Sequence, residues 1–212
     1  HAVKLLRRIG PRGLLIGIDK DEESLNTARK RLGAVSENFK LYRGSFGKIR
    51  EFANRAGLKE VDGILLDLGF SMKHIKKDKR GFSFSEDSKL DMRYDTDSGI
   101  AAYKWLNTAA EEEISAVLKK YGQEKKANRI AEEIYKKRKD KKIMTAKDLA
   151  NLVRNIKGKR SNQKRDPATK TFQAVRIFIN NELDILKESL PACLRILKTG
   201  GRLAVLTYHS LE

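Results

Sequence analysis

The apolar run Leu14-Leu15-Ile16-Gly17-Ile18 follows a segment rich in glycine and proline and ends at Asp19. A short run of this kind predicts a buried strand of a parallel sheet. Further strands are expected from Phe39 to Tyr42 and from Val61 to Asp67, with helices between the strands at about 21–32 and 46–56. This alternation of strands and helices is typical of βαβ units, so the sequence predicts an α/β fold with a parallel sheet.

A polar stretch that contains several glycines runs from Leu68 to Gly99. It is too long for a routine connection, and long loops at strand ends usually carry function. Beyond it the spacing of apolar residues predicts three amphipathic helices, the first capped at Thr108 and the third at Thr145.

The last part of the chain is expected to hold one helix and one strand. Apolar side chains at core spacing predict a long helix from about Ala168 to Leu186, and Pro191 is expected to start or kink a following turn. A strand is expected from Arg202 to Tyr208, after Gly200 and Gly201.

The 212 residues suffice for one domain with an insertion. No apolar run approaches the roughly 18 to 20 residues of a membrane span, which excludes a membrane protein. The single cysteine, Cys193, excludes an internal disulfide, fits a reducing compartment and is expected in the core. With 46 Lys and Arg against 28 Asp and Glu, the formal charge is +18, so nucleic acid is the first partner to consider.

The positive charge is concentrated in one part of the chain. Between Lys119 and Arg165 there are 18 basic and 5 acidic residues, so this stretch carries +13 of the total. We interpret it as a basic insertion in a more neutral body, and a solvated helical surface is the alternative.

Two acids end predicted strands and are candidates for a ligand site. Asp19 and Asp67 both fall at the carboxyl edge of the sheet, where α/β folds bind their ligands. The alternative for Asp19 is a helix N-cap, and the alternative for Asp67 is a buried carboxylate that caps a loop. His74 and His209 lack a His, Cys or carboxylate neighbour at ligand spacing, so no metal site is expected.

The long loop mixes charged and aromatic side chains in two short strings. These are Arg80-Gly81-Phe82-Ser83-Phe84 and Lys89-Leu90-Asp91-Met92-Arg93. Such a mixture suits phosphate contacts and base stacking.

Together, six strings resemble the signatures of the bacterial small-subunit ribosomal RNA (cytosine-N4)-methyltransferases, the RsmH/MraW type. They occur in the family's order along essentially the whole chain: Asp62-Gly63-Ile64-Leu65-Leu66-Asp67-Leu68-Gly69, Arg80-Gly81-Phe82-Ser83-Phe84, Leu90-Asp91-Met92-Arg93, Tyr121-Gly122-Gln123-Glu124, Ala168-Thr169-Lys170-Thr171-Phe172-Gln173-Ala174-Val175-Arg176-Ile177 and His209-Ser210-Leu211-Glu212.

The resemblance implies a class I S-adenosylmethionine-dependent methyltransferase with a Rossmann-like sheet. The methyltransferase domain would comprise residues 1–99 and 166–212, incomplete at both ends, and the basic helical insertion residues 100–165. His1 would be the last residue of the family's Gly-Gly-His cofactor loop, so the first strand and its glycines are expected to precede it. The implied partner is small-subunit (16S-type) ribosomal RNA or a 30S-type subunit, with a homodimer left open.

The resemblance also implies the site residues. The residues expected to bind S-adenosyl-L-methionine are His1, Asp19, Phe46, Asp67 and His74, and Asp67 is also expected to orient the target amine. The chain departs from the family at Ser71-Met72-Lys73-His74, where Ser-Ser-Pro-Gln is usual, and Tyr94 replaces a common Met. The side chains expected to bind RNA are Arg80, Arg93, Lys136, Lys137, Arg138, Lys139, Lys170 and Arg176.

Two other functions stay open at this point. One is a non-catalytic RNA-binding or ribosome-assembly factor that keeps the fold, and the other is a DNA amino-methyltransferase. The second is disfavoured because Asp67-Leu68-Gly69-Phe70 lacks the prolines of the Asp-Pro-Pro-Tyr type motif of those enzymes. The expected location is the cytoplasm, and an organelle of bacterial descent is the alternative.

Overall fold

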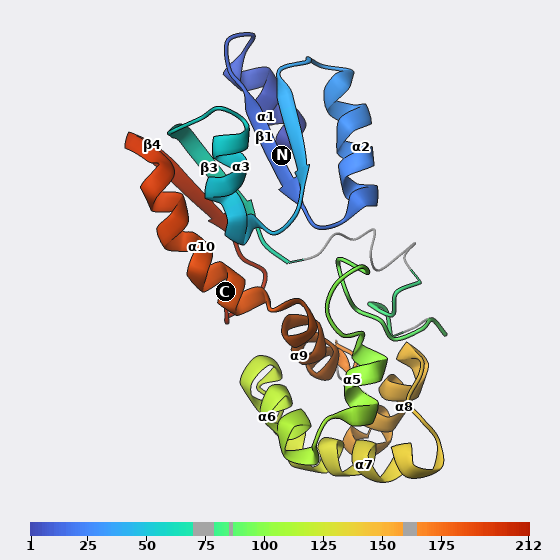
Figure 1. Ribbon diagram of the computed structural model, residues 1–212. Coiled ribbons are helices and arrows are strands. Elements are labelled where there is room, and N and C mark those ends of the chain that lie inside the picture. The colour runs from blue at the N-terminus through green and yellow to red at the C-terminus, as the bar shows by residue number, and fades with distance from the viewer. Residues whose placement is uncertain (70–78, 85–86, 159–164) are drawn as a thin grey trace. The chain divides into compact units, whose positions relative to one another are not determined.

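The computed structural model describes residues 1–69, 79–84, 87–158 and 165–212 (Figure 1). The chain divides into two compact units. Unit 1 comprises residues 1–69, 183–210 and 212, and unit 2 comprises residues 70–182 and 211. The expected insertion, residues 100–165, lies inside unit 2. Unit 2 also includes residues 70–99 of the long loop and the helix that follows the insertion.

Unit 1 is a mixed α/β structure, as the sequence predicts. Its elements are α1 (Ala2–Ile9), β1 (Leu15–Asp19), α2 (Glu22–Gly33), β2 (Phe39–Arg43), the short 3₁₀ helix η1 (Phe46–Lys48), α3 (Ile49–Arg55), β3 (Val61–Asp67), β4 (Leu197–Leu206) and most of α10 (Glu182–Ile196). Strand β1 pairs with β2, and β3 pairs with β4, both in parallel. The described strands form two sheets of two strands each.

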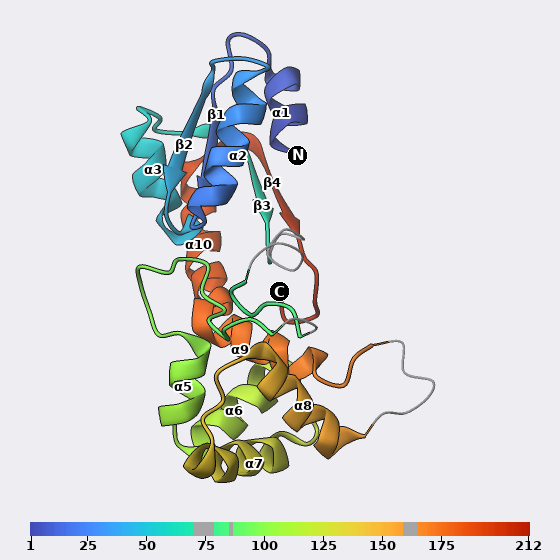
Figure 2. The same ribbon diagram turned by 90° about the vertical axis from the view of Figure 1, so that its right-hand side faces the viewer.

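The parallel pairing aligns the carboxyl ends of neighbouring strands. Asp19 pairs with Arg43 where β1 and β2 end, and Asp67 pairs with Leu206 where β3 and β4 end. Figure 2 shows α3 on one side of β1 and β2, with α1 and α2 on the other side. Each acid therefore lies at the edge of a sheet at which the parallel fold places ligands.

A small hydrophobic cluster joins β3 and β4 to α10. It contains the buried side chains of Leu66, Leu68, Leu186 and Cys193, with Phe46, Ile49, Ile64, Leu190 and Leu203 packed against it. Cys193 is fully buried, which confirms it as a core residue, and burial raises the pKa of its thiol. The cluster fixes the end of β3, and with it the position of Asp67.

The described part of unit 2 begins with residues 79–84 and 87–101, which form no helix, and is mainly helical beyond them. Its helices are α5 (Ala102–Thr108), α6 (Glu111–Gly122), α7 (Ala127–Asp140), α8 (Ala146–Lys157) and α9 (Thr169–Asn180). Their apolar faces form a core in which Leu106, Ile114, Leu118, Ile130, Ile134, Leu149 and Val175 are fully buried. A Cβ on Gly122 would stand 2.7 Å from the carbonyl oxygen of Lys170, so this glycine permits the close approach of α6 and α9.

Four local expectations were wrong. Strand β4 runs from Leu197 to Leu206 and includes Gly200 and Gly201, whereas the sequence predicts a strand from Arg202 to Tyr208. Thr108 caps no helix: it is the last residue of α5, and its hydroxyl donates to the carbonyl of Lys104. The long helix expected from Ala168 ends at Asn180, because Asn181 adopts a left-handed conformation that separates α9 from α10. Pro191 lies inside α10 rather than at a turn.

The capping box expected at Thr145 is confirmed. The backbone N–H of Asp148 donates to the Thr145 hydroxyl, and the Asp148 carboxylate accepts the backbone N–H of Thr145 in return. Among the described residues, no helix has the length and hydropathy to cross a bilayer.

Candidate active site

Asp67, the last residue of β3, lies at the centre of the candidate site. Its Oδ1 accepts a hydrogen bond from the hydroxyl of Tyr208 at 2.9 Å. Its Oδ2 lies 3.0 Å from Nδ1 of His1, and the two form an ion pair when the ring is protonated. The Asp67 side chain is 46% exposed, so the alternative of a buried loop-capping carboxylate was wrong. Two of the predicted cofactor residues, His1 and Asp67, are in direct contact.

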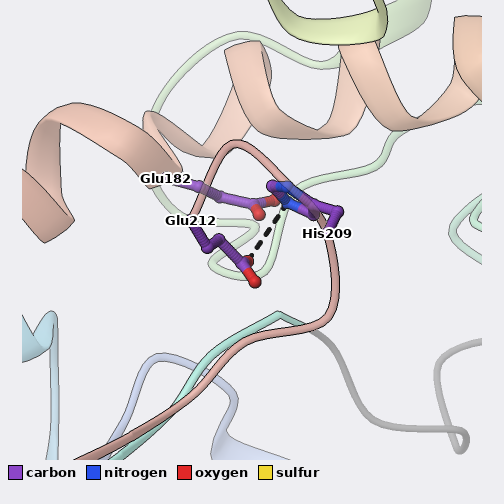
Figure 3. A group of neighbouring side chains, drawn as sticks. All are labelled: Glu182, His209 and Glu212. Atoms are coloured by element: carbon purple, nitrogen blue, oxygen red, sulfur yellow. Dashed lines mark ion pairs between the residues drawn. The ribbon is translucent and has the colours of Figure 1, made fainter.

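The turn after β4 holds Tyr208 beside Asp67. The carboxylate of Glu212 accepts the backbone N–H of Tyr208 at 2.8 Å. It also lies 3.1 Å from Nε2 of His209, and the two form an ion pair when the ring is protonated. Figure 3 shows this ion pair as a dashed line between the His209 ring and the Glu212 carboxylate. The backbone N–H of Glu212 donates to the carbonyl of His209 and closes the turn. His209, which the sequence left without a neighbour, therefore has a local structural partner.

Asp19 ends β1, and its carboxylate is held by the backbone. Its Oδ1 accepts the N–H of Asp21 at 2.8 Å. The alternative of Asp19 as a helix cap was wrong, because the N-cap of α2 is Asp21, whose side chain accepts the N–H of Ser24 at 2.9 Å. Asp19 is thus left at the strand end with a fixed carboxylate, which suits recognition of a polar ligand.

Phe46 and His74 are the other two predicted cofactor residues. Phe46 opens η1, is half-buried and packs against the cluster of Leu66 and Leu186. His74 lies outside the described residues.

Within unit 2, the two arginines predicted in the long loop make internal contacts. The guanidinium of Arg80 donates to the carbonyls of Arg93 and Tyr94 at 3.0 and 2.9 Å. Arg93 forms a bidentate ion pair with Asp91, with distances of 2.7 and 2.9 Å. Although burial opposes it, the Arg93 guanidinium holds the pKa of Asp91 below its usual value. Phe82 is buried and stacks on Tyr94, so these side chains order the loop itself.

The predicted residues on α9 also have internal partners. Arg176 is buried and donates from Nε and Nη2 to the two oxygens of Glu182 at 2.8 and 2.9 Å. Lys170 is exposed, and its ammonium donates to the carbonyl of Gln123 at 3.2 Å. Of these two, Lys170 presents its side chain to solvent.

The four predicted basic residues of α7 fall into two groups. Arg138 donates to the carbonyls of Leu106 and Ala109 at 2.9 and 2.7 Å. It therefore provides hydrogen-bond donors for backbone carbonyls at the C-terminal end of α5. Lys136 and Lys139 are exposed and Lys137 is half-buried, and Lys136 pairs with Glu132 one turn earlier. The three lysines therefore form the more accessible part of this basic helix end.

Tyr208 is the residue of the site that the sequence did not reveal. It lies 141 positions from Asp67, and the two meet only because β3 and β4 are neighbours. One signal in the sequence could have indicated it. The expected strand ended at Tyr208, and the carboxyl end of a strand parallel to β3 lies at the same sheet edge as Asp67.

Comparison with known proteins gives the chain a family. Residues 1–212 match the sequence model of the MraW methylase family. A protein of Fusobacterium nucleatum is 42% identical over 212 residues, and one of Dictyoglomus turgidum is 45% identical over 213 residues. A third, from Chromobacterium violaceum, is 46% identical over 213 residues. Each of the three is named ribosomal RNA small subunit methyltransferase H.

The matches cover all of this chain and 67%, 71% and 66% of those three relatives, respectively. The chain thus spans about two thirds of their length. The match to the family model and the relatives agree with the resemblance carried by the six sequence strings. The chain belongs to the MraW methylase family.

Proposed function

We propose that this chain methylates the N4 amino group of a cytidine in small-subunit ribosomal RNA, with S-adenosyl-L-methionine as the methyl donor. The observation that carries the proposal is the partly exposed Asp67 carboxylate at the carboxyl end of β3, in a member of a methylase family. The names of the relatives supply the substrate class.

The side chains at the strand ends fit S-adenosylmethionine. A carboxylate at the end of β1, Asp19, can accept the hydroxyl groups of a ribose. The half-buried ring of Phe46 offers an apolar face to the adenine, and Asp67 supplies negative charge and hydrogen-bond acceptors. When bound, the cofactor supplies an electrophilic methyl group on a positively charged sulfonium. In the proposal, His1 and His74 also contact it.

The target amine needs help from the protein. The lone pair on N4 of cytosine is delocalised into the ring, which makes this nitrogen a poor nucleophile. An acceptor that takes a hydrogen bond from N4 as it becomes tetrahedral aligns the lone pair and increases its reactivity. Asp67 is the acceptor that we assign to this task, together with the backbone carbonyls that follow it.

Base and backbone of the RNA would be bound by different parts of the chain. The cytosine must leave its stack to reach a catalytic pocket, which favours a loop or a single-stranded region. The +13 segment from Lys119 to Arg165 would attract the phosphates, and Lys136, Lys137, Lys139 and Lys170 are the residues most suited to contact them.

For the fold, we propose the class I Rossmann-like architecture with residues 100–165 as the helical insertion. The parallel pairs β1–β2 and β3–β4, with helices on both sides of the first pair, support it. One more parallel strand, paired with β1 on one side and β3 on the other, would join the two pairs into one sheet. We further propose a cytoplasmic location, because the relatives are bacterial, and leave the homodimer as a prediction.

A methyl-transfer assay with three arms tests the proposal. The protein is incubated with methyl-labelled S-adenosylmethionine and either small-subunit ribosomal RNA, assembled small subunits or double-stranded DNA. Label is expected in ribosomal RNA, free or assembled, and not in DNA. Label in DNA alone would favour a DNA amino-methyltransferase. Tight RNA binding without label in any arm would favour the non-catalytic assembly factor.

A further inference from the structure

Tyr208 reaches the proposed site from the strand next to Asp67. Leu206, the last residue of β4, pairs with Asp67, the last residue of β3. Two residues further on, the hydroxyl of Tyr208 donates to Oδ1 of Asp67 at 2.9 Å. The Tyr208 residue is 68% exposed, so this contact lies at the open edge of the sheet, where substrates can approach.

Tyr208 is exposed but held in place. Its backbone N–H donates to Oε2 of Glu212 at 2.8 Å. A Cβ on Gly69 would be 3.5 Å from Cδ2 of the ring, so the tyrosine passes close to the backbone that follows β3. These contacts fix where the hydroxyl group lies, although the ring contributes little to the core.

We propose that Tyr208 is a positioning residue for methyl transfer, whose hydroxyl fixes the orientation of the Asp67 carboxylate toward the target amine. This inference rests on the function proposed above. The terminal torsion of an aspartate is broad, so an exposed carboxylate without such a donor samples many orientations. An ionised carboxylate offers about four acceptor sites. Tyr208 and His1 each contact a different oxygen, and acceptor capacity remains on both for the reacting groups.

The electrostatics of the contact keep Tyr208 a hydrogen-bond donor. Its hydrogen bond to Asp67, and the negative charge of that carboxylate, raise the pKa of the Tyr208 phenol above its ordinary value, and Glu212 adds to the effect. The phenol therefore stays protonated at physiological pH, which the positioning role requires.

Two substitutions of the same residue separate the hydroxyl from the ring. In the natural protein, Tyr208→Phe removes the hydroxyl alone, and Tyr208→Leu also removes the aromatic face. We expect both variants to lower kcat by about tenfold, the effect of losing one hydrogen bond to a charged group, with little change in KM for RNA. Tyr42→Phe, on a ring that stacks on Phe52 in the same unit, is the matched control and should keep wild-type kcat.

Some results of this comparison would overturn the inference. A Tyr208→Phe variant with normal kcat contradicts positioning by the hydroxyl, and normal activity in Phe with a defect in Leu would assign the effect to the ring. A rise in KM for RNA with kcat unchanged would make Tyr208 a binding residue instead. Because Tyr208 is exposed, both Tyr208 variants are expected to melt at the wild-type temperature.

A double-mutant cycle with Asp67→Asn separates this inference from the proposed function. Tyr208 acts through Asp67, so adding Tyr208→Phe to Asp67→Asn should cause no further loss of kcat. Multiplying losses would contradict the inference. If Asp67→Asn alone keeps full activity, the proposed role of Asp67 fails. If Asp67→Asn is defective but Tyr208→Phe is normal, only the positioning role fails.

A spectroscopic measurement tests the contact without any assay of activity. In NMR titrations of ¹³C-labelled tyrosine, Asp67→Asn should lower the pKa of Tyr208, because the carboxylate that opposes the phenolate is gone. An unchanged Tyr208 titration would show that the hydroxyl does not contact Asp67 in solution.

Discussion

At the scale of single residues, the backbone at position 81, next to Arg80, requires a glycine. Its φ is +79°, and a Cβ there would stand 2.7 Å from the carbonyl oxygen of Lys89 and 2.8 Å from Cα of Leu90. The backbone N–H of Asp91 donates to the carbonyl of Arg80 next to this crossing. Two strings of the family signature therefore meet backbone to backbone.

Gly81→Ala is expected to destabilise the protein more than the same change at Gly99. Gly99 has a similar φ of +70° but nothing within 4 Å of an added Cβ, so it reports the backbone strain alone. We expect a loss of about 1 kcal/mol in the free energy of unfolding at Gly99 and about 2 to 4 kcal/mol at Gly81, where a steric clash is added. Urea unfolding of both variants measures the difference, and equal losses would contradict the described crossing.

The sequence could identify Asp19 and Asp67 but not Tyr208. The two acids end apolar runs, and the carboxyl end of a parallel strand is recognisable from the sequence. Tyr208 joins Asp67 across 141 positions, through the pairing of β3 with β4, and no local pattern encodes that neighbour. The arginine contacts show the same limit: Arg138 satisfies carbonyls of α5, about thirty positions earlier, in a helix end that looks like a solvated basic face.

At the scale of elements, strands were easier to predict than helix ends. Strands β1, β2 and β3 lie within one residue of the expected ranges, because apolar runs bounded by breakers define them. Helix α5 was missed since it has seven residues, too few for a periodic pattern. Asn181 ended α9 unexpectedly, because asparagine is compatible with both helical and left-handed conformations.

The capping box of α8 makes a pH-dependent contribution to stability. Burial alone would raise the pKa of Asp148, but the backbone N–H groups of Met144 and Thr145 hold it below its usual value. A lowered folded pKa means that the stabilisation is complete above the ordinary carboxyl pKa and is lost as the pH falls through the folded pKa.

Asp148→Ala should therefore lower the free energy of unfolding at neutral pH by about 1 kcal/mol, a typical value for a helix cap. The difference from the wild type should shrink as the pH falls below about 4, the ordinary carboxyl pKa, and then through the lower pKa of the folded carboxylate. Urea unfolding at a series of pH values measures this, with Asp140→Ala at the end of α7 as a control. A difference that stays constant down to the most acidic pH would exclude the carboxylate as its source.

At the scale of the whole molecule, the uneven charge predicts how the protein holds RNA. The segment from Lys119 to Arg165 carries +13 of the +18. Several arginines expected to face RNA instead form internal contacts, as Arg138 and Arg176 do. The accessible lysines near the end of α7 are left as the main candidates for phosphate contacts in this part of the chain.

Replacing Lys136, Lys137 and Lys139 together with Gln should weaken RNA binding and flatten its dependence on salt. For every phosphate that the protein no longer neutralises, the slope of log K against log salt concentration should decrease in magnitude by about 0.7 to 0.9. Fluorescence anisotropy with small-subunit RNA at several salt concentrations measures the slope. Changing Lys4, Lys30 and Lys59 to Gln removes equal charge from unit 1, and this control should leave the slope near the wild-type value. Equal effects of the two triple variants would point to net charge rather than to a docking face.

The central claim is that the carboxylate at the end of β3 directs a methyl group to N4 of a cytidine in small-subunit ribosomal RNA. Mass spectrometry of nucleosides tests it most directly, after unmodified RNA or subunits have been treated with S-adenosylmethionine and either the natural protein or its Asp67→Asn variant. We predict N4-methylcytidine with the natural protein and at least about a 100-fold slower formation with the variant. A methyl group on another atom, or equal rates for the two proteins, would contradict the claim.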